Sequence, residues 1–414
     1  MTADELAALA EFAAARTAPT TRSASTAMIT SLPPDDSGVA GFSFRHASVY
    51  GAPIDIFSPV RDAASFIANA TTLDEVTGGA ARLSPLSSFL AAATRRRYEH
   101  AVYVVGNSNH NIETVQLLQR AGPLQLCGRT TVYLHDPNCL NVVSQTLRLE
   151  PAPFADYIEQ LYGRSLPVRR HRKLQLWEVR EAALEARIFA VRALAEAGVH
   201  RFIVNSTAAR ELVETDLGEG RHDIRTIFHP VFPPQARKSP NQQSGSPLLV
   251  GSYGVPGPNK HTRLVIDAVA ELRRRRIAAR LLISGFDARD FARRAFSGHP
   301  PNWIEVDEPA TEAQFQCQLA RCDVAVQLRD KNLGESSGVV PSLLALGIPT
   351  IVSPLGAFLD YGPATARLDR TTPDALADLL ASPHAWPTAE AMARYVSDHT
   401  LDRFEPVFRQ ALVD

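Results

Sequence analysis

The stretch that decides the fold runs from residue 322 to residue 353 and reads CDVAVQLRDKNLGESSGVVPSLLALGIPTIVS. It begins with the apolar run Val324–Leu328, continues through a polar loop, and ends in the β-branched run Thr350–Val352. Between the two runs, the spacing of apolar residues predicts a helix from about Ser336 to Leu346, which Gly347 and Pro349 terminate. Strand, loop, helix and strand in this order form the repeating unit of a parallel β-sheet.

The loop and first helical turn, Gly334-Glu335-Ser336-Ser337-Gly338, predict a binding site for an anionic group. A helix that follows a parallel strand presents unpaired N–H groups and the positive end of its dipole. Gly338 lets a phosphate oxygen approach the backbone, and either serine can cap the helix or donate to the phosphate. A phosphate would repel Glu335, which favours a role for this carboxylate as an acceptor for sugar hydroxyls. A second interpretation stays open, in which the helix is buried and capped and Glu335 stabilises its positive end.

Length and composition limit the class of protein. A chain of 414 residues is too long for one ordinary hydrophobic core, so we expect two domains. Hydrophobic residues make up 45% of the chain and charged residues 21%, and the net charge of -1 argues against nucleic acid as a partner. The four cysteines form no Cys-x-x-Cys pair, so we expect reduced thiols, a cytoplasmic location and no structural zinc. No run of about 18 apolar residues predicts a membrane span, and the acidic start argues against a signal peptide.

Strand and helix patterns alternate on both sides of a polar stretch at residues 235–246. This arrangement predicts an α/β protein with two doubly wound, Rossmann-like domains that face an interdomain cleft. We expect an N-terminal helix and linker at 1–25, a first domain at 26–240, and a second domain at 247–395. We expect a C-terminal helix at 396–414 to pack back on the first domain.

Polar clusters follow several predicted strands of the first domain. Ser37 and Gly38 stand where a loop enters a helix, Asn107 follows the strand that ends at Val105, and His135-Asp136 follows the next strand. Ligands of open α/β sheets bind at the carboxyl ends of the strands, so these clusters are candidate parts of one site. Each cluster is also compatible with an ordinary turn.

The second domain repeats this pattern. Ser252-Tyr253-Gly254 and Ser284-Gly285 each follow a predicted strand, and Lys260 stands at the start of a predicted helix. A lysine at this end of a helix opposes the dipole unless a bound anion compensates it.

Two basic runs, Arg95–Arg97 and Val168–Lys173, have two interpretations. They are either solvated faces or contacts for an anionic membrane surface or acceptor.

From about Met28 onward, the chain resembles retaining glycosyltransferases of the GT-B fold, in family 4 of the group 1 type. The matching segments occur in the family's order and are 32–43 (LPPDDSGVAGFS), 105–108 (VGNS), 134–136 (LHD), 203–206 (IVNS), 251–254 (GSYG) with Lys260, 284–285 (SG), 323–324 (DV), 335–338 (ESSG) and 347–349 (GIP).

The resemblance implies a role for each matching residue. Lys260 would hold the donor diphosphate, Glu335 would bind hydroxyls of the donor sugar, and His135 would contact the transferred sugar, which makes these three the expected catalytic residues. The remaining donor-binding candidates are Ser252, Tyr253, Gly254, Ser284, Gly285, Arg329, Ser336, Ser337, Gly338 and Val339. The acceptor-side candidates are Ser37, Gly38, Asn107, His135 and Asp136.

Two departures from the family pattern concern the nucleotide. Leu343 stands where the family has its second glutamate, and no arginine precedes Lys260 at the usual place, although Arg329 or Arg263 could substitute. The sequence contains no Asp-x-Asp, so we expect no metal site and no cofactor besides the nucleotide-diphosphate sugar that serves as donor substrate.

The resemblance implies a retaining, metal-independent hexosyltransferase that acts on a glycan, a lipid-linked or another hydroxyl acceptor in surface polysaccharide or glycoconjugate synthesis. We expect it in the cytoplasm, with peripheral contact at the inner face of the membrane as an open option. The alternative is a non-catalytic GT-B module that binds a nucleotide sugar or a partner. An epimerase or a phosphorylase on the same fold also stays open, whereas a dehydrogenase would need a Gly-x-Gly-x-x-Gly run that the sequence lacks.

Overall fold

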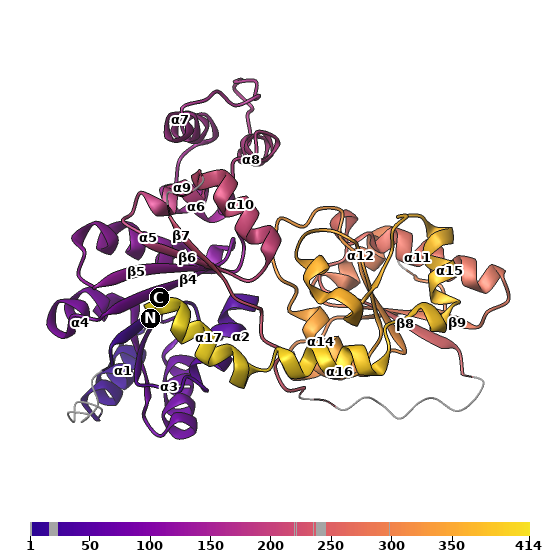
Figure 1. The fold of residues 1–414 in the computed structure, drawn as a ribbon, viewed down its shortest axis with the longest axis horizontal. Coiled ribbons are helices and arrows are strands. Elements are labelled where there is room, and N and C mark those ends of the chain that lie inside the picture. The colour runs from indigo at the N-terminus through magenta and orange to yellow at the C-terminus, as the bar shows by residue number, and fades with distance from the viewer. Residues whose placement is uncertain are drawn as a thin grey trace. The chain divides into compact units, whose positions relative to one another are not determined.

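The computed structural model describes residues 2–15, 24–218, 220, 222–234, 236, 246–297 and 299–414. It divides into two compact units, each built on one parallel sheet with helices around it (Figure 1). The first unit comprises Met1–Phe228, Leu333–Glu335 and Phe404–Asp414, and the second comprises His229–Asn332 and Ser336–Arg403.

Two predicted domain boundaries differ from these units. The chain passes to the second unit at His229, and residues 396–403 also belong to that unit. The reason is a pairing between the two stretches, in which the N–H of Val231 donates to the carbonyl of His399 at 2.7 Å and Val231 forms a parallel bridge with Thr400. Most of the predicted linker at 235–246, and residues 16–23 of the N-terminal linker, lie outside the described residues.

The first sheet has seven parallel strands in the order β3-β2-β1-β4-β5-β6-β7. Its centre is apolar on both faces, as expected where helices cover a parallel sheet, and β4 reads HAVYVV with every residue after the first buried. The strands are β1 (Thr26–Ile29), β2 (Ile54–Ser58), β3 (Ala81–Pro85), β4 (His100–Val105), β5 (Arg129–Leu134), β6 (Arg201–Val204) and β7 (Asp223–Thr226).

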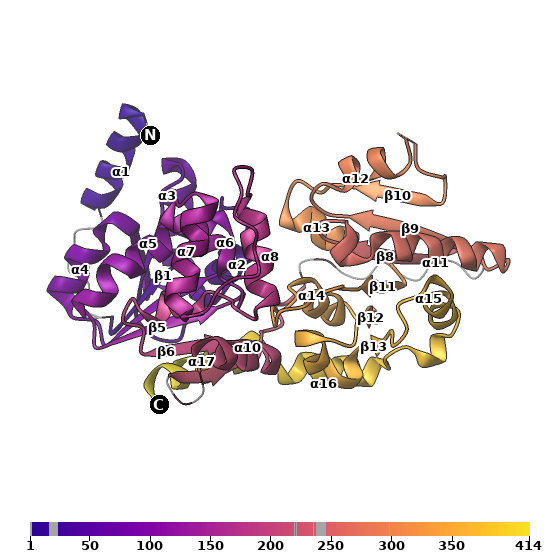
Figure 2. The same ribbon diagram turned by 90° about the horizontal axis from the view of Figure 1, so that it is seen from above.

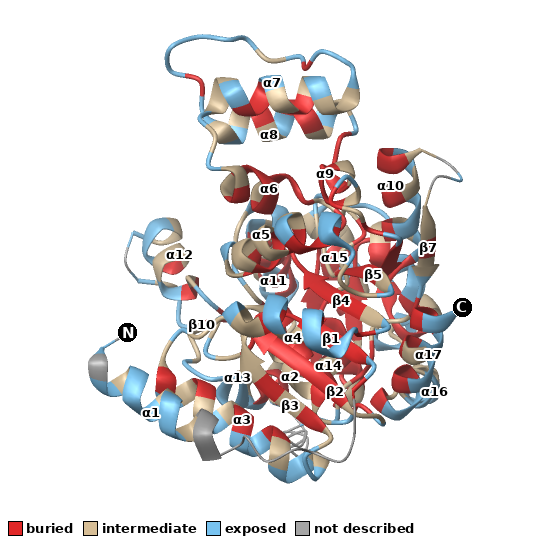
Figure 3. Ribbon diagram, turned by 90° about the vertical axis from the view of Figure 1, so that its left-hand side faces the viewer, coloured by how far each residue is buried: buried red, intermediate tan, exposed pale blue. Residues whose placement is uncertain are grey.

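Helices surround this sheet, and Figure 3 shows buried strands in red beneath helices with exposed outer faces. Caps fix several helix starts; for example, the Ser37 hydroxyl accepts the N–H of Ala40 at 3.2 Å at the start of α2. The helices are α1 (Ala3–Ala15), α2 (Gly38–Ala47), α3 (Ala63–Thr77), α4 (Phe89–Arg96), α5 (Ile112–Ala121), α6 (Leu140–Leu147), α7 (Pro151–Tyr162), α8 (Leu176–Glu185), α9 (Val191–Ala195) and α10 (Thr207–Leu217).

The second sheet has six parallel strands in the order β10-β9-β8-β11-β12-β13. The strands are β8 (Leu248–Tyr253), β9 (Ala279–Ser284), β10 (Ile304–Asp307), β11 (Val324–Gln327), β12 (Thr350–Val352) and β13 (Ala366–Arg367). The helices are α11 (Thr262–Arg274), α12 (Ala288–Ala295), α13 (Glu312–Leu319), α14 (Val339–Ala345), α15 (Pro373–Leu380) and α16 (Ala389–Asp398), with 3₁₀ segments η4 (Pro258–Lys260) and η5 (Gly356–Ala364).

Helices surround the second sheet (Figure 2), and two separate apolar layers cover its faces. One joins Val250, Leu281 and Val324 to α11, α12 and α15. The other joins Leu249 and Leu282 to α13 and α14. Because the strands are all parallel, the loops at their carboxyl ends lie along one edge of the sheet.

The structure corrects the start of one predicted helix and adds short strands. Helix α14 begins at Val339 and not at Ser336, because the Ser337 hydroxyl accepts the N–H groups of Val339 and Val340 at 3.3 and 3.2 Å. Strands β3, β7 and β13 were not predicted from the sequence, because none of them contains a run of apolar residues.

Helix α17 (Leu401–Val413) supplies the last residues of the first unit. Phe404 and Phe408 are fully buried, and both rings lie within 5.0 Å of the ring centroid of His46. The Glu405 carboxylate accepts the N–H of Gly51 at 3.0 Å. The C-terminal residues are therefore part of the core of the first unit.

His46 should make the first unit sensitive to acid. Both of its ring nitrogens are buried and have no hydrogen-bond partner among the described residues, and burial lowers its pKa from 6.5 to about 3. The unfolded chain therefore binds a proton below pH 6.5 that the folded chain excludes, so stability is full above pH 6.5 and falls as the pH drops toward 3.

We expect His46→Leu to remove this dependence of the free energy of unfolding on pH, which amounts to about 1.4 kcal/mol per pH unit. Urea unfolding at pH 5 and pH 7.5 measures it, with the exposed His384→Leu as the matched control. The assignment would be contradicted if the free energy of unfolding changed by the same amount between pH 5 and pH 7.5 in wild type and in His46→Leu.

None of the helices in the described ranges has the length and apolarity needed to cross a membrane.

Candidate functional site

Lys260 lies over the carboxyl end of β8. Its ammonium group donates to the carbonyl of Tyr253 at 3.1 Å, and a Cβ on Gly254 would lie only 2.7 Å from the same nitrogen. The cation is half-buried and stands at the strand end that the sequence predicted.

Gly254 and Gly285 bring the ends of β8 and β9 into direct backbone contact. The N–H of Gly254 donates to the carbonyl of Ser284 at 2.9 Å. Gly285 has φ of 151°, and a Cβ there would lie 2.6 Å from the Gly254 carbonyl oxygen. Only glycine can occupy position 285, because the Gly254 carbonyl belongs to the backbone and cannot move away as a flexible side chain could.

A matched pair of substitutions tests this packing. Gly285→Ala should destabilise the second unit by about 2 kcal/mol through backbone strain. Gly338→Ala should cost almost nothing, since Gly338 has φ of -72° and open space around its Cβ position. Thermal unfolding of both variants measures the difference, and equal midpoints would refute the close contact.

Hydrogen bonds join Lys260's loop to the loop that follows β11. The carbonyl of Asn259 accepts the N–H of Asp330 at 2.9 Å, and its side-chain oxygen accepts the N–H of Lys331 at 3.2 Å. The Ser353 hydroxyl, after β12, accepts the N–H of Arg329 and donates to its carbonyl, both at 2.9 Å. Three strand-end loops are thereby fixed to one another.

The Arg329 side chain lies beside η5. Its guanidinium stands 5.6 Å from the centroid of Phe358 and donates to the Leu328 carbonyl at 2.9 Å. Arg329 thus stays at the strand-end edge, where the sequence predicted a donor-binding cation.

The segment Ser336–Gly338 is partly open. Gly338 is exposed and Ser336 is half-buried, whereas Ser337 is buried and caps α14. The hydroxyl of Tyr361 donates to the Ser337 carbonyl at 3.4 Å. Since the N–H of Val339 already donates to Ser337, a phosphate that approached Val339 would compete with this cap.

Glu335 bonds to its own loop. Its carboxylate accepts the N–H of Leu333 at 2.7 Å, and the residues Leu333–Glu335 belong to the first unit. In that unit the Ser206 hydroxyl donates to the Gly334 carbonyl at 2.7 Å. Leu343, the position of the missing second glutamate, is fully buried among apolar residues, so a carboxylate could not be accommodated there.

Two of the predicted donor-binding residues have buried side chains. The ring of Tyr253 is buried, packs against Phe315 and donates its hydroxyl to the Gln318 carbonyl at 3.0 Å, and burial raises its pKa well above 10. The Ser284 hydroxyl is fully buried. Tyr253 and Ser284 therefore offer backbone groups and not side chains at this edge.

The acceptor-side candidates of the first unit lie together at the ends of β4 and β5. The N–H of Asn107 donates to the Asp136 carboxylate at 2.8 Å, and the Asn107 side chain accepts two N–H groups at the start of α6. A Cβ on Gly106 would lie 2.7 Å from Val39 and 3.1 Å from Asp136, so the first turn of α2, with Ser37 and Gly38, adjoins this cluster. The pKa of Asp136 is raised by desolvation.

His135 lies next to this cluster. Its ring contacts the edge of Phe42 at 4.4 Å and Tyr133 at 4.7 Å, and it is half-buried. The aromatic neighbours fix the orientation of the imidazole.

Sequence reasoning missed an ionic cluster at the same edge. Asp35 pairs with Arg61 at 2.7 Å and with His110 at 3.2 Å, and Arg61 also pairs with Glu113 at 2.7 Å. Asp35, Arg61 and His110 follow β1, β2 and β4, and Glu113 lies in the first turn of α5. Only the position of Arg61 just after an apolar run could have indicated this cluster.

Solved structures share this arrangement of two sheets. HepE from Anabaena, in complex with UDP and glucose, matches with a TM-score of 0.61 at 14% identity over 94% of this chain and 99% of HepE. WaaG, a glycosyltransferase involved in lipopolysaccharide biosynthesis, matches at 0.54 and 13%, over 94% and 99%. The catalytic domain of starch synthase IV from Arabidopsis thaliana, bound to ADP and acarbose, matches at 0.57 and 10%, over 95% and 99%.

The fold is GT-B. No family model matches the sequence, and no curated protein matches it either. At these identities the likeness concerns the GT-B fold and leaves the substrates open.

The basic runs on this GT-B scaffold are only partly paired. Arg170 forms ion pairs with Asp156 and Glu159, and Arg96 pairs with Asp55 at 2.5 Å. Arg169 and Arg172 are exposed on the segment between α7 and α8.

No group of three or more His, Cys, Asp or Glu residues within the described ranges is arranged to hold a metal ion.

Proposed function

We propose that this GT-B protein is a glycosyltransferase that moves a hexosyl group from a nucleotide-diphosphate sugar to a hydroxyl acceptor. The observation that carries the proposal is Lys260, held over the end of β8 beside loops that are hydrogen-bonded to one another. HepE holds UDP and glucose, and starch synthase IV holds ADP and acarbose, which supports a nucleotide sugar as the ligand class.

In the proposed reaction, the bond between the anomeric carbon and the diphosphate oxygen breaks, and a bond from the acceptor oxygen to that carbon forms. The electron pair of the broken bond leaves with the diphosphate, and the acceptor proton passes to a phosphate oxygen. Lys260 stabilises the developing negative charge, and Glu335 binds sugar hydroxyls. With retention, the acceptor attacks from the face that the diphosphate leaves.

The first unit supplies the acceptor side in this proposal. Asp136, His135 and the start of α2 form one polar cluster at strand ends. A glycan or lipid-linked acceptor in surface polysaccharide or glycoconjugate synthesis fits this cluster and the likeness to WaaG.

Peripheral contact with a membrane from the cytoplasmic side is part of the proposal. Trp177 is 57% exposed and follows the segment that carries Arg169 and Arg172, and this combination suits an anionic lipid surface. Sedimentation with phosphatidylglycerol vesicles, compared with phosphatidylcholine vesicles, tests it.

A non-catalytic GT-B module is the second candidate, because buried Leu343 removes one carboxylate of the expected donor site. Incubation with UDP-, GDP- and dTDP-sugars, with and without EDTA, separates the two. Donor hydrolysis or transfer that persists in EDTA supports a metal-independent transferase. Saturable binding without turnover supports the module, and binding of none of these donors overturns both.

A further inference from the structure

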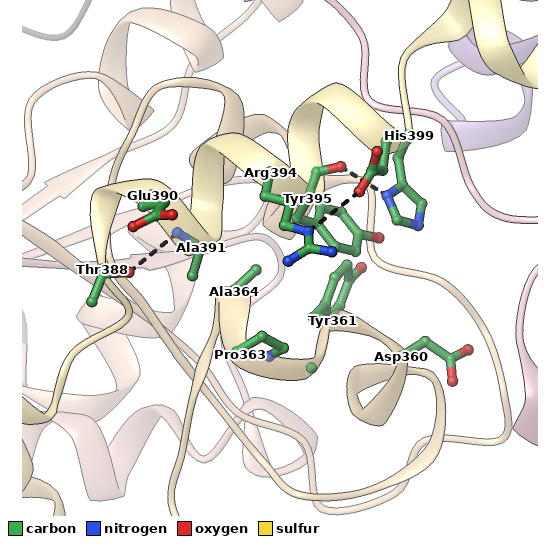
Figure 4. Close-up of a pocket in the computed structure, with 12 residues that line it drawn as sticks. Asp360, Tyr361, Pro363, Ala364, Thr388, Glu390, Ala391, Arg394, Tyr395 and His399 are labelled. Carbon is green, nitrogen blue, oxygen red and sulfur yellow. Dashed lines mark hydrogen bonds and ion pairs between the residues drawn. The ribbon is translucent and has the colours of Figure 1, made fainter.

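A pocket lies in the second unit between η5 and α16. It encloses about 440 Å³, which falls within the roughly 300–1,000 Å³ of small-molecule sites. Figure 4 shows Arg394 and Tyr395 on α16 opposite Tyr361 and Pro363 on η5. None of the donor or acceptor candidates named above lines this pocket.

Aromatic rings form one wall of the pocket. Tyr395 and His399 stack at 3.9 Å with an interplanar angle of 12°, and Tyr361 meets Tyr395 at 5.5 Å. The Tyr395 carbonyl bonds to the His399 ring at 2.8 Å, and Tyr361 is 4% exposed, so these rings are held in place. With Pro363, Tyr395 presents fixed apolar surface to a ligand, and the buried ring of Tyr361 supports it.

The charged residues of the pocket are mostly acidic. Asp360, Glu390 and Asp398 provide three carboxylates, and Arg394 lines the pocket 4.0 Å from Asp398. Arg403 also pairs with Asp398, at 3.2 Å, so the carboxylates of Asp360 and Glu390 are the ones that disfavour phosphates and carboxylic acids. They suit a ligand that donates many hydrogen bonds.

We propose that this pocket binds a neutral saccharide unit, separately from the nucleotide-sugar site. A pyranose has apolar C–H faces that suit the ring of Tyr395, and hydroxyl groups around its edge that donate to carboxylates such as Asp360 and Glu390. The pocket thereby serves as an anchoring site for a glycan.

Tyr361 connects this saccharide site to the Ser336–Gly338 segment. Its ring lines the pocket, and its hydroxyl donates to the Ser337 carbonyl at 3.4 Å. If the proposed function is right, on which this step rests, a bound saccharide will change the affinity for the donor, and the donor will change the affinity for the saccharide by the same factor.

Saturation-transfer NMR on the full chain tests the proposal. The neutral probes are maltotriose, cellobiose, lactose and N,N′-diacetylchitobiose, and the charged probes are choline and glucose 6-phosphate. We expect a signal from at least one neutral probe that is lost in Ala391→Trp, which fills the pocket, and weakened about tenfold or more in Tyr395→Ala. Tyr395→Phe, which keeps the ring, and the exposed Arg370→Ala should retain it.

Three results would overturn the saccharide site. The first is that no neutral probe gives a signal sensitive to Ala391→Trp. The second is that only choline or glucose 6-phosphate gives a pocket signal. The third is that saturating UDP removes the neutral-probe signal while Tyr395→Ala leaves that signal unchanged, because the probe would then compete directly with UDP for its site. Because this readout needs no turnover, it stands or falls independently of the transferase activity.

Discussion

Lys260→Ala should lower kcat/KM for sugar transfer by about 10²–10³-fold. The ammonium group is the cation at the end of β8, and the diphosphate that leaves gains negative charge in the transition state. The fold should survive, because Lys260 is half-buried and its bond to the Tyr253 carbonyl lies at the sheet edge. Steady-state kinetics with the active donor, with thermal unfolding alongside, measures both effects.

Arg370→Ala is the control, since Arg370 is an exposed cation of the second unit and lies outside the candidate site. It should leave kcat/KM within about twofold. Glu335→Ala should abolish transfer if Glu335 binds the donor sugar. Near-normal transfer in Lys260→Ala would remove the site assignment, whereas loss of activity together with a collapsed unfolding midpoint would show a structural role instead.

Phe408→Ala should destabilise the first unit by about 3–5 kcal/mol. The ring is fully buried and contacts His46 at 4.6 Å and Tyr133 at 5.5 Å, so truncation leaves a cavity between α17 and the sheet. Hydrogen exchange of the β4 amides reports on this unit directly, and their protection should fall by about 10²–10³-fold.

Val407→Ala is the control on the same helix, because Val407 is 38% exposed. Its β4 protection should stay within about threefold of the wild-type value. Similar losses in the two variants would mean that α17 contributes through its helicity and not through burial of its aromatic face.

Much of the fold follows from local sequence. The apolar runs of β4, β5 and β11 predict buried parallel strands, and Ser37 with Gly38 predicts the start of α2. The positions of Lys260 and of the Asn107–Asp136 cluster at strand ends follow from the same alternation of strand and helix.

Side-chain direction and long-range contacts were harder to predict. Alternation along β8 places Tyr253 on the same face as Leu249, toward α13, and this period of two could have identified it as a core residue. The contact of Tyr361 with Ser337 joins residues 24 positions apart, and the pairing of Asp35 with Arg61 and His110 joins three loops. No local pattern encodes such contacts.

The end of α17 has a consequence for synthesis of the protein. The aromatic surface formed by Phe42, His46 and Tyr133 is covered by Phe404 and Phe408, which are translated only after the whole of His229–Arg403. At about 5–20 residues per second, the ribosome needs roughly 10–35 s to make that intervening stretch. During this interval the nascent first unit exposes this aggregation-prone aromatic surface. A ribosome-associated chaperone that shields aromatic surface should therefore raise the yield of the native protein.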